Sequence, residues 1–249
     1  MTAAAASAHN AAMDTAALLD SVEFQTGPDP RWAVIWLHGL GADGNDFAPM
    51  VPQLVPPGWP AIRFVFPHAP VRAVTINGGM RMRAWYDIQP GDFDPQHFGD
   101  RADAAGIEAS VAQVEALIAR EAARGIAPPR ILLAGFSQGG AVALAAALRR
   151  VEPLAGVIAL SSYLPAANRA GVGLADSARE QPVFMAHGAH DNVVPYAAGE
   201  QAARRLRELG LTVDWHRYPI AHQVSPEEIR DLAGWMTRRF AHDVADTPS

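Results

Sequence analysis

One short stretch of the sequence places a serine where it could act as a nucleophile. Residues 135–139 read G-F-S-Q-G, follow a short apolar run and precede a segment of small residues. A G-x-S-x-G pattern between a buried strand and a helix is typical of a nucleophile elbow, a sharp turn that projects the serine oxygen at the carboxyl end of the strand. Glycines at 135 and 139 would leave room for the neighbouring strand and helix. The alternative is a glycine-rich turn in which Ser137 only caps the helix.

The composition restricts which covalent chemistry the chain can perform. All 20 basic residues are arginine, and there is no cysteine. Without cysteine there are no disulfides, thiolate metal sites or cysteine nucleophiles, and without lysine there is no Schiff base or P-loop lysine. The net charge of -6 gives no electrostatic reason to expect nucleic acid or an anionic membrane as a partner.

A serine nucleophile needs a histidine base that a carboxylate orients. On folds with this elbow the acid follows the serine along the chain, and the histidine comes last. The histidines after the elbow are His187, His190, His216, His222 and His242. We predict His222 as the base, because it falls in a loop between the last strand and the last helix. We predict Asp191 as the acid, because it follows the carboxyl end of a strand. Asp214 lies within a predicted strand and Asp176 precedes one, so both are weaker candidates.

Acyl transfer also needs hydrogen-bond donors for the oxyanion of the tetrahedral intermediate. The first predicted donor is the backbone N–H of Gln138, the residue after the serine. The second is the backbone N–H of Leu40, in the stretch HGLG at 38–41, which follows an early apolar run and fits a His-Gly type of oxyanion loop. We expect His38 to be structural, with its ring hydrogen-bonded to this loop.

Two other patterns have competing interpretations. Residues 39–44 also spell G-x-G-x-x-G, but no acidic residue follows at the end of the next strand, as a dinucleotide site requires. His187, His190 and Asp191 have the spacing of metal ligands, but no HExxH motif or further His/Glu cluster joins them. We therefore predict no cofactor and no metal. A nicotinamide oxidoreductase and a catalytically silent binding module of the same fold remain the alternatives.

Strands and helices alternate along the chain in the order that such a site requires. Short, continuously apolar runs, as buried parallel strands have, occur at 31–37, 61–66, 130–134, 154–160, 182–186 and 211–218. Segments with helical periodicity separate the later runs, with stop signals at Gly125 and Gly210 and a Ser225 cap before the last helix. This alternation predicts a single α/β domain over residues 21–241, with a mostly parallel sheet and helices on both faces.

Three segments do not fit the alternation. Residues 1–20 are rich in alanine and lack the features of a secretory signal, so we expect a mobile tail, and 242–249 form a polar tail. Residues 67–100 have no helical period, and irregular stretches of this length are usually functional. No stretch is apolar enough for a transmembrane helix, so we expect no stable membrane insertion and a cytoplasmic location.

Together these stretches resemble the phospholipase/carboxylesterase family, the branch with bacterial carboxylesterases and acyl-protein thioesterases. The matching sequences are VIWLHGLGADGNDF at 34–47, FPHAP at 66–70, MRAWYDI at 82–88, GFSQGGAVAL at 135–144, HGAHDNVVP at 187–195 and YPIAHQVSPEEI at 218–229. The resemblance implies an α/β-hydrolase fold and a Ser137–Asp191–His222 triad. It also implies oxyanion amides at Leu40 and Gln138.

The resemblance further implies that the 67–100 segment forms a substrate groove, to which Trp85 and His68 contribute, and that the chain forms a homodimer. A position in the hydrophobic core is the alternative for Trp85. The expected activity is hydrolysis of small-molecule carboxylic esters with short to medium acyl chains. Protein thioesters and lysophospholipids are the alternative substrates. The sequence does not rank them, because acyl-chain selectivity depends on the shape of the groove.

Overall fold

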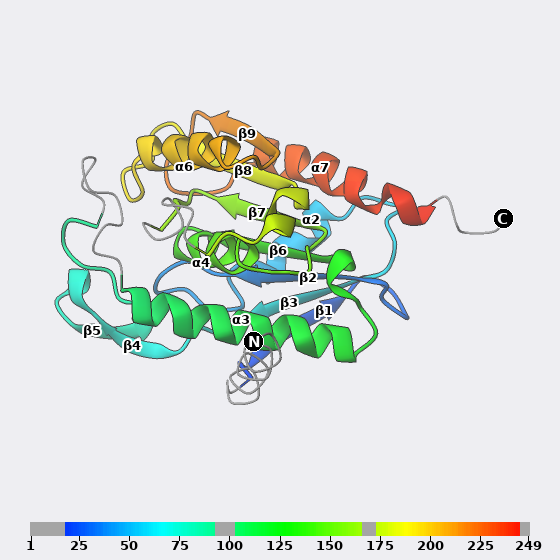
Figure 1. Ribbon diagram of the computed structural model, residues 1–249, viewed down its shortest axis with the longest axis horizontal. Coiled ribbons are helices and arrows are strands. Elements are labelled where there is room, and N and C mark those ends of the chain that lie inside the picture. The colour runs from blue at the N-terminus through cyan, green and yellow to red at the C-terminus, as the bar shows by residue number, and fades with distance from the viewer. Residues whose placement is uncertain (1–17, 93–102, 166–172, 245–249) are drawn as a thin grey trace, which may run out of the picture.

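One seven-stranded sheet forms the centre of the protein (Figure 1). The computed structural model describes residues 18–92, 103–165 and 173–244. The strand order is β1-β3-β2-β6-β7-β8-β9, and every neighbouring pair is parallel except β1 with β3. The strands are β1 (Ser21–Gln25), β2 (Trp32–Leu37), β3 (Ile62–Pro67), β6 (Ile131–Phe136), β7 (Gly156–Leu160), β8 (Val183–Gly188) and β9 (Val213–Tyr218).

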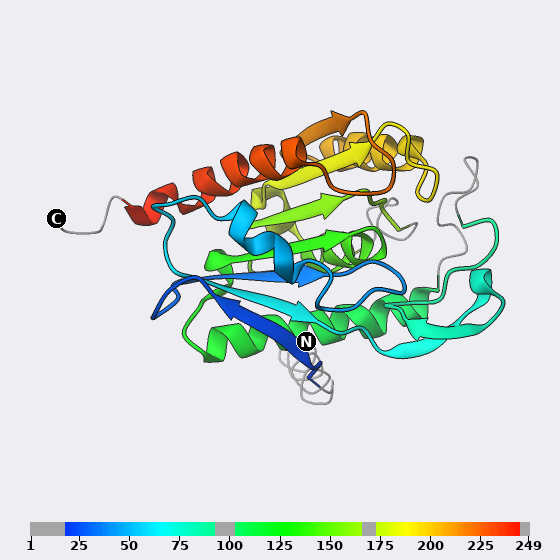
Figure 2. The same ribbon diagram turned by 180° about the vertical axis from the view of Figure 1, so that it is seen from behind.

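Helices cover both faces of the sheet (Figures 1 and 2). One face carries α3 (Ala104–Ala123), α4 (Gln138–Ala147) and α6 (Tyr196–Glu208), and the other carries α2 (Val51–Leu54) and α7 (Pro226–Val244). Short 3-10 turns lie at η1 (Ala48–Met50), η2 (Thr75–Asn77), η3 (Pro128–Arg130) and η4 (Asp176–Glu180). The predicted mostly parallel sheet between two helical layers is confirmed.

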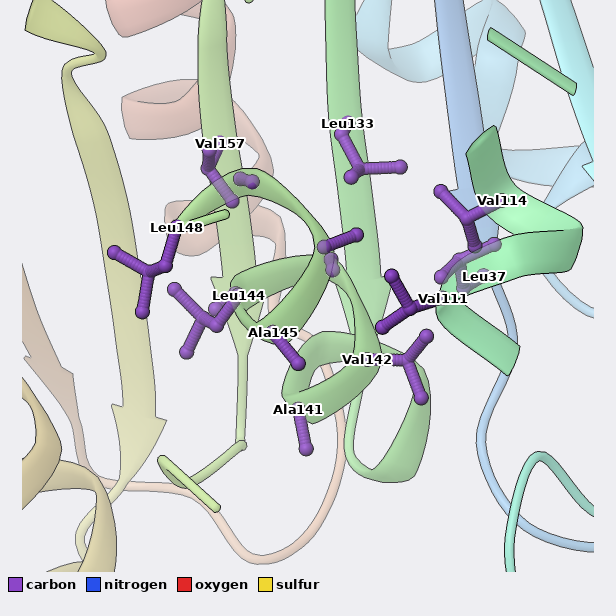
Figure 3. Close-up of a cluster of buried hydrophobic side chains, with 14 of the residues drawn as sticks. Leu37, Val111, Val114, Leu133, Ala141, Val142, Leu144, Ala145, Leu148 and Val157 are labelled. Carbon is purple, nitrogen blue, oxygen red and sulfur yellow. The ribbon is translucent and has the colours of Figure 1, made fainter. Parts of the chain in front are cut away.

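The central helix α4 is buried along its whole length. Figure 3 shows its Val142 beside Val111 of α3, and its Leu144 close to the sheet strand that carries Val157. Most of its residues are alanine or glycine, so the helix axis can approach the strands closely. This packing fixes the amino end of α4, and therefore the residue that precedes it.

Each predicted strand and helix is present, and the sequence missed three strands. β1 lies at the sheet edge and alternates polar and apolar residues, so it has no continuous apolar run. β4 (Val71–Val74) and β5 (Met80–Arg83) form an antiparallel hairpin inside the stretch predicted to be irregular. Arginines interrupt both hairpin strands, which hides them from a search for apolar runs. Residues 93–100 of that stretch, and most of the two predicted tails, lie outside the described residues.

The strand order reverses at the centre of the sheet. The chain runs from β2 outward to β3, and then returns to place β6 on the other side of β2. In open α/β sheets, ligands bind beyond the carboxyl ends of the strands at such a switch point. The loop at 38–41 follows β2 and Ser137 follows β6, so the predicted site lies at this position.

Candidate active site

Ser137 joins β6 to α4 in a strained backbone conformation. Its φ of 54° and ψ of -119° lie in a region that residues with a side chain rarely adopt. The surrounding structure holds this conformation, because the Ser137 N–H donates to the Leu160 carbonyl at 2.8 Å and the Ser162 hydroxyl donates to the Ser137 carbonyl at 2.8 Å. Sequence reasoning missed Ser162, which supports the turn from the end of the neighbouring strand. The geometry is that of a nucleophile elbow.

The two glycines of the elbow are required by close backbone contacts. A Cβ atom at Gly135 would overlap the backbone of Gly139, and one at Gly139 would lie 2.6 Å from the His38 carbonyl oxygen. The amino end of α4 therefore packs directly against the end of β2. As a result, the Gln138 N–H and the 38–41 loop lie on adjoining segments.

Asp191 follows β8, and its carboxylate accepts hydrogen bonds at both oxygens. Oδ2 lies 2.7 Å from His222 Nδ1 and 3.3 Å from His187 Nε2. Oδ1 accepts from the backbone N–H groups of Val193 and Val194, each at 2.9 Å. Burial alone would raise the pKa of the Asp191 carboxyl, but the hydrogen bonds from the two histidines and from Val193 hold it well below its usual range. The carboxylate therefore stays ionised beside His222.

His222 lies in the loop between β9 and α7, with 15% of its side chain exposed. Its ring packs against that of Phe136, with centroids 4.7 Å apart, so it lies next to the residue that precedes Ser137. Because Nδ1 is bonded to Asp191, Nε2 is the nitrogen left to accept a proton. Within the described residues no hydrogen bond joins Ser137 to His222, and in substrate-free enzymes such bonds often form only in the complex.

The other histidine candidates have different surroundings. His190 is exposed, and its backbone N–H donates to the Ile220 carbonyl at 3.0 Å. His216 pairs with Asp214 at 3.0 Å within β9, so the rival acid is engaged there. His187 is buried and bonded to the Val194 carbonyl at 3.0 Å. The side chain of the remaining candidate, His242, lies outside the described residues.

The two predicted oxyanion amides carry no hydrogen bond to the described part of the chain. Leu40 lies between two fixed points, because the Gly41 N–H donates to the Arg83 carbonyl at 2.9 Å and His38 Nδ1 donates to the Gly39 carbonyl at 2.7 Å. The Leu40 and Gln138 N–H groups are thus free to donate to a substrate oxygen. The assignment of these two amides to the oxyanion hole remains a prediction, which their lack of hydrogen-bond partners among the described residues supports.

His38 is structural, as the sequence led us to expect. The Ala69 N–H donates to its Nε2 at 3.1 Å, so the ring proton is on Nδ1, which donates within the loop. Burial lowers the pKa of His38, and the ring stays neutral. The side chain links the 38–41 loop to the start of the segment after β3.

The two predicted groove residues have different positions. Trp85 has no exposed surface, and its indole N–H donates to the His38 carbonyl at 2.8 Å, so it does not line an open groove. Its place in an irregular segment suggested a groove, but the ring instead fills the core beneath the site. His68 is partly exposed and accepts from the Gly44 N–H at 3.1 Å. Its contribution to a groove stays a prediction.

Neither a metal-binding cluster nor a membrane-spanning helix is present within the described ranges. Across residues 18–92, 103–165 and 173–244, no three His, Asp or Glu side chains are grouped so that they could hold a metal ion. Of the three residues with metal-like spacing, His187 contacts Asp191 at 3.3 Å, and His190 is exposed. Over the same ranges, every helix is too short or too polar to cross a membrane.

Comparisons with known proteins agree with this geometry. Acyl-protein thioesterase 1 of Gibberella zeae is 36% identical over 216 residues, which cover 83% of this chain and 90% of the relative. Carboxylesterase SOBER1 of Arabidopsis thaliana is 32% identical over 211 residues, which cover 84% of this chain and 91% of the relative. The crystal structure of SOBER1 matches with a TM-score of 0.78 at 31% identity, over 84% of this chain and 99% of that chain.

The family match covers the strands and loops that carry the site. The sequence model of the phospholipase/carboxylesterase family matches residues 22–238, which include Ser137, Asp191 and His222. The structural relatives share the mostly parallel sheet between helices. This protein therefore belongs to the phospholipase/carboxylesterase family and has the α/β-hydrolase fold.

Proposed function

We propose that Ser137, His222 and Asp191 hydrolyse carboxylic esters of short to medium acyl chain length through an acyl-enzyme. Ester hydrolysis as a class follows from membership of the family. One observation carries the residue assignment: Asp191 Oδ2 lies 2.7 Å from His222 Nδ1, on loops that meet beside the Ser137 elbow.

In the acylation step, Ser137 Oγ attacks the acyl carbon while His222 Nε2 takes the serine proton. The carbonyl π electrons move to oxygen, and the Leu40 and Gln138 amides stabilise the resulting oxyanion. When the tetrahedral intermediate collapses, the C–O bond to the alcohol breaks and His222 returns the proton to the leaving oxygen. Asp191 fixes the imidazole tautomer and stabilises the imidazolium.

Deacylation repeats these steps with water as the nucleophile. His222 takes a proton from the water, whose oxygen attacks the acyl-serine carbon. The second tetrahedral intermediate then collapses and releases the carboxylic acid, and His222 returns the proton to Ser137 Oγ. The same two amides support both intermediates.

Thioesters of acylated proteins are the second candidate substrates. A relative named acyl-protein thioesterase and one named carboxylesterase match this chain at 36% and 32% identity. The triad can cleave either bond, since both reactions pass through the same acyl-enzyme. Lysophospholipids, a homodimeric state and a cytoplasmic location stay among our proposals.

An acyl-chain-length series on p-nitrophenyl esters and matched thioesters, with Ser137→Ala as the control, tests the function. We expect wild-type hydrolysis and a loss of about 10⁴-fold or more in kcat for the variant. A fluorophosphonate probe should label wild type and leave Ser137→Ala unlabelled, because it reacts with an activated serine. Near-full activity of Ser137→Ala would contradict the nucleophile, and no labelling of wild type would favour a silent binding module.

A pair of histidine variants tests the base. His222→Ala should lose activity to a similar extent as Ser137→Ala, whereas His190→Ala should keep it. His190 is a matched control because it is exposed and adjoins Asp191 in sequence. An inactive His190→Ala beside an active His222→Ala would reverse the assignment.

A further inference from the structure

The two proposed oxyanion donors belong to different segments of the chain. The Leu40 amide lies in the loop after β2, and the Gln138 amide begins α4. Both amides must lie about 3 Å from one developing oxyanion, so the spacing between the two segments matters for catalysis. We therefore looked for side chains that join these segments.

Trp85 is hydrogen-bonded to both. Its indole N–H donates to the His38 carbonyl at 2.8 Å, two residues before Leu40. Its backbone N–H donates to the side-chain Oε1 of Gln138 at 2.9 Å. Its carbonyl accepts from the Ser110 hydroxyl of α3, and none of its surface is exposed. Trp85 is thus fixed by a helix as well as by both oxyanion segments.

The Gln138 side chain completes the connection. Its Nε2 donates to the Tyr86 carbonyl at 2.8 Å, so its amide pairs with the backbone of residues 85 and 86 through both a donor and an acceptor. Gln138 is 1% exposed, so these buried groups have little access to water as a substitute partner. The preceding Arg83 carbonyl holds the Gly41 N–H at 2.9 Å. Residues 83–86 therefore bind the Leu40 loop on both sides of Leu40.

We propose that Trp85 and the side chain of Gln138 are positioning residues, which set the spacing between the Leu40 and Gln138 amides. Both side chains are buried beneath the site and act through the backbone. This inference rests on the proposed esterase function. It assigns a task to two side chains that family membership and the triad leave without one.

The chemistry predicts which kinetic constant responds. The oxyanion forms in the transition state, so donors that move away from it lower kcat and leave the binding of the neutral substrate unchanged. A misplacement of about 1 Å can cost about 10²-fold in rate. A loss of general fold stability would instead lower the melting temperature without this separation of kcat from KM.

Two substitutions remove the connection while keeping the oxyanion amides. Trp85→Phe keeps a six-membered aromatic ring and the backbone N–H, and removes the indole N–H donor together with the five-membered ring that carries it. Gln138→Leu keeps the backbone N–H and most of the volume, and removes both side-chain hydrogen bonds. We expect each to lower kcat by about 10- to 100-fold with KM within about twofold of wild type. The inhibition constant of an alkyl trifluoromethyl ketone, whose hemiketal carries an oxyanion, should rise by a similar factor.

Trp59→Phe is the matched control. The Trp59 indole N–H also donates a hydrogen bond, to the Thr237 hydroxyl at 2.9 Å, but at a partly buried position on the opposite face of the sheet. We expect this variant to keep the kcat and inhibition constant of wild type. Melting temperatures of all variants monitor the fold.

Unchanged kcat and inhibition constant in both folded variants would overturn the inference. A rise in KM in place of a fall in kcat would also overturn it. If Trp85→Phe does not fold, Gln138→Leu decides alone. Wild type is measured first, and a wild type that neither hydrolyses esters nor reacts with a fluorophosphonate would overturn the proposed function itself.

Discussion

At the scale of single residues, the two oxygens of Asp191 have separate tasks. Oδ1 is held by the N–H groups of Val193 and Val194, which can only donate. Oδ2 faces His222 and His187. The turn after β8 therefore fixes which oxygen meets the His222 imidazole, and the tautomer of that imidazole follows.

Asp191→Asn should show this fixed orientation. The two backbone donors would hold the amide oxygen at the Oδ1 position, which places the NH₂ group against His222 Nδ1. The imidazole would then be forced into the tautomer with its proton on Nε2, which cannot accept the serine proton. We expect kcat to fall by about 10⁴-fold with the fold retained, measured on a p-nitrophenyl ester beside a thermal melt. Activity within tenfold of wild type would contradict this role.

Glu228 is a buried carboxyl in the first turn of α7, close in sequence to His222. Its backbone N–H donates to the Ser225 hydroxyl at 3.1 Å, the helix cap that the sequence predicted. Neither carboxyl oxygen accepts a hydrogen bond of good geometry from the described residues. Burial raises the pKa of Glu228 from 4.5 to about 8, and the nearby Ser225 backbone offsets only part of this effect.

The contribution of Glu228 to the free energy of unfolding should therefore fall as the pH rises between about 4.5 and about 8. In this window the unfolded chain has lost the Glu228 proton while the folded chain keeps it, so folding becomes less favourable with pH. Glu228→Gln removes the titration. Its stability relative to wild type should rise by about 2–4 kcal/mol from pH 5 to pH 8 in urea unfolding. Parallel pH profiles for the two proteins would contradict the raised pKa.

At the scale of elements, a buried ion pair joins α3 to the sheet. Arg63 of β3 donates to Glu121 of α3 at 2.8 Å, and the Glu121 side chain has no exposed surface. Arg120 and Arg124 also contact Glu121, at 3.1 and 3.0 Å, and both contact Glu23 of the edge strand β1. Charged residues from three elements thus meet under the edge of the sheet.

Glu121→Ala should be strongly destabilising. The change leaves Arg63 buried without its partner, which we expect to cost about 3 kcal/mol of unfolding free energy. Glu208→Ala is the control, since it removes an exposed pair with Arg205 and should cost less than about 1 kcal/mol. Urea unfolding of the two variants provides the comparison. Equal losses of unfolding free energy in the two variants would show that burial does not determine how much the Glu121 contacts stabilise the fold.

Apolar patterning predicted the elements that are buried on both sides. The runs that become β2, β6, β7 and β8 are completely or almost completely buried, so their sequences contain little except apolar residues. β1, β4 and β5 are edge or hairpin strands that glutamate or arginine interrupts, so none of them has a continuous apolar run. A search for such runs therefore does not detect them.

At the scale of the whole molecule, one sheet separates two apolar cores. Leu144 of α4 belongs to the core on one face, and Leu232 of α7 belongs to the core on the other. Both cores include side chains of the same strands, such as Leu133 and Leu132 of β6. We expect the two layers to unfold together, as the single predicted domain requires.

Leucine truncations in the two layers test this coupling. Leu144→Ala and Leu232→Ala should each cost about 2–5 kcal/mol, because each leaves a cavity in a packed core. Both should shift one common transition when fluorescence and circular dichroism are followed in urea. A transition that only one of the two variants shifts would contradict a single cooperative unit.

The sequence predicted the three residues of the proposed triad more fully than the residues that support them. Ser137, Asp191 and His222 each belong to a recognisable motif at the end of a strand. The hydrogen bonds of Trp85, Ser162 and His187 join segments that are distant in sequence or depend on side-chain direction. Trp85 shows the difference best, because its irregular segment suggested an exposed groove and its ring is completely buried.

The positive φ of Ser137 also implies a trade-off between activity and thermal stability. The backbone conformation at φ 54° and ψ -119° costs glycine less free energy than it costs any residue with a Cβ atom. Ser137→Gly should therefore melt at a higher temperature than Ser137→Ala, and above wild type as well, while it hydrolyses nothing. A laboratory selection for heat resistance alone would favour the loss of Ser137, the proposed nucleophile, so stabilised variants need to be screened for turnover in the same round.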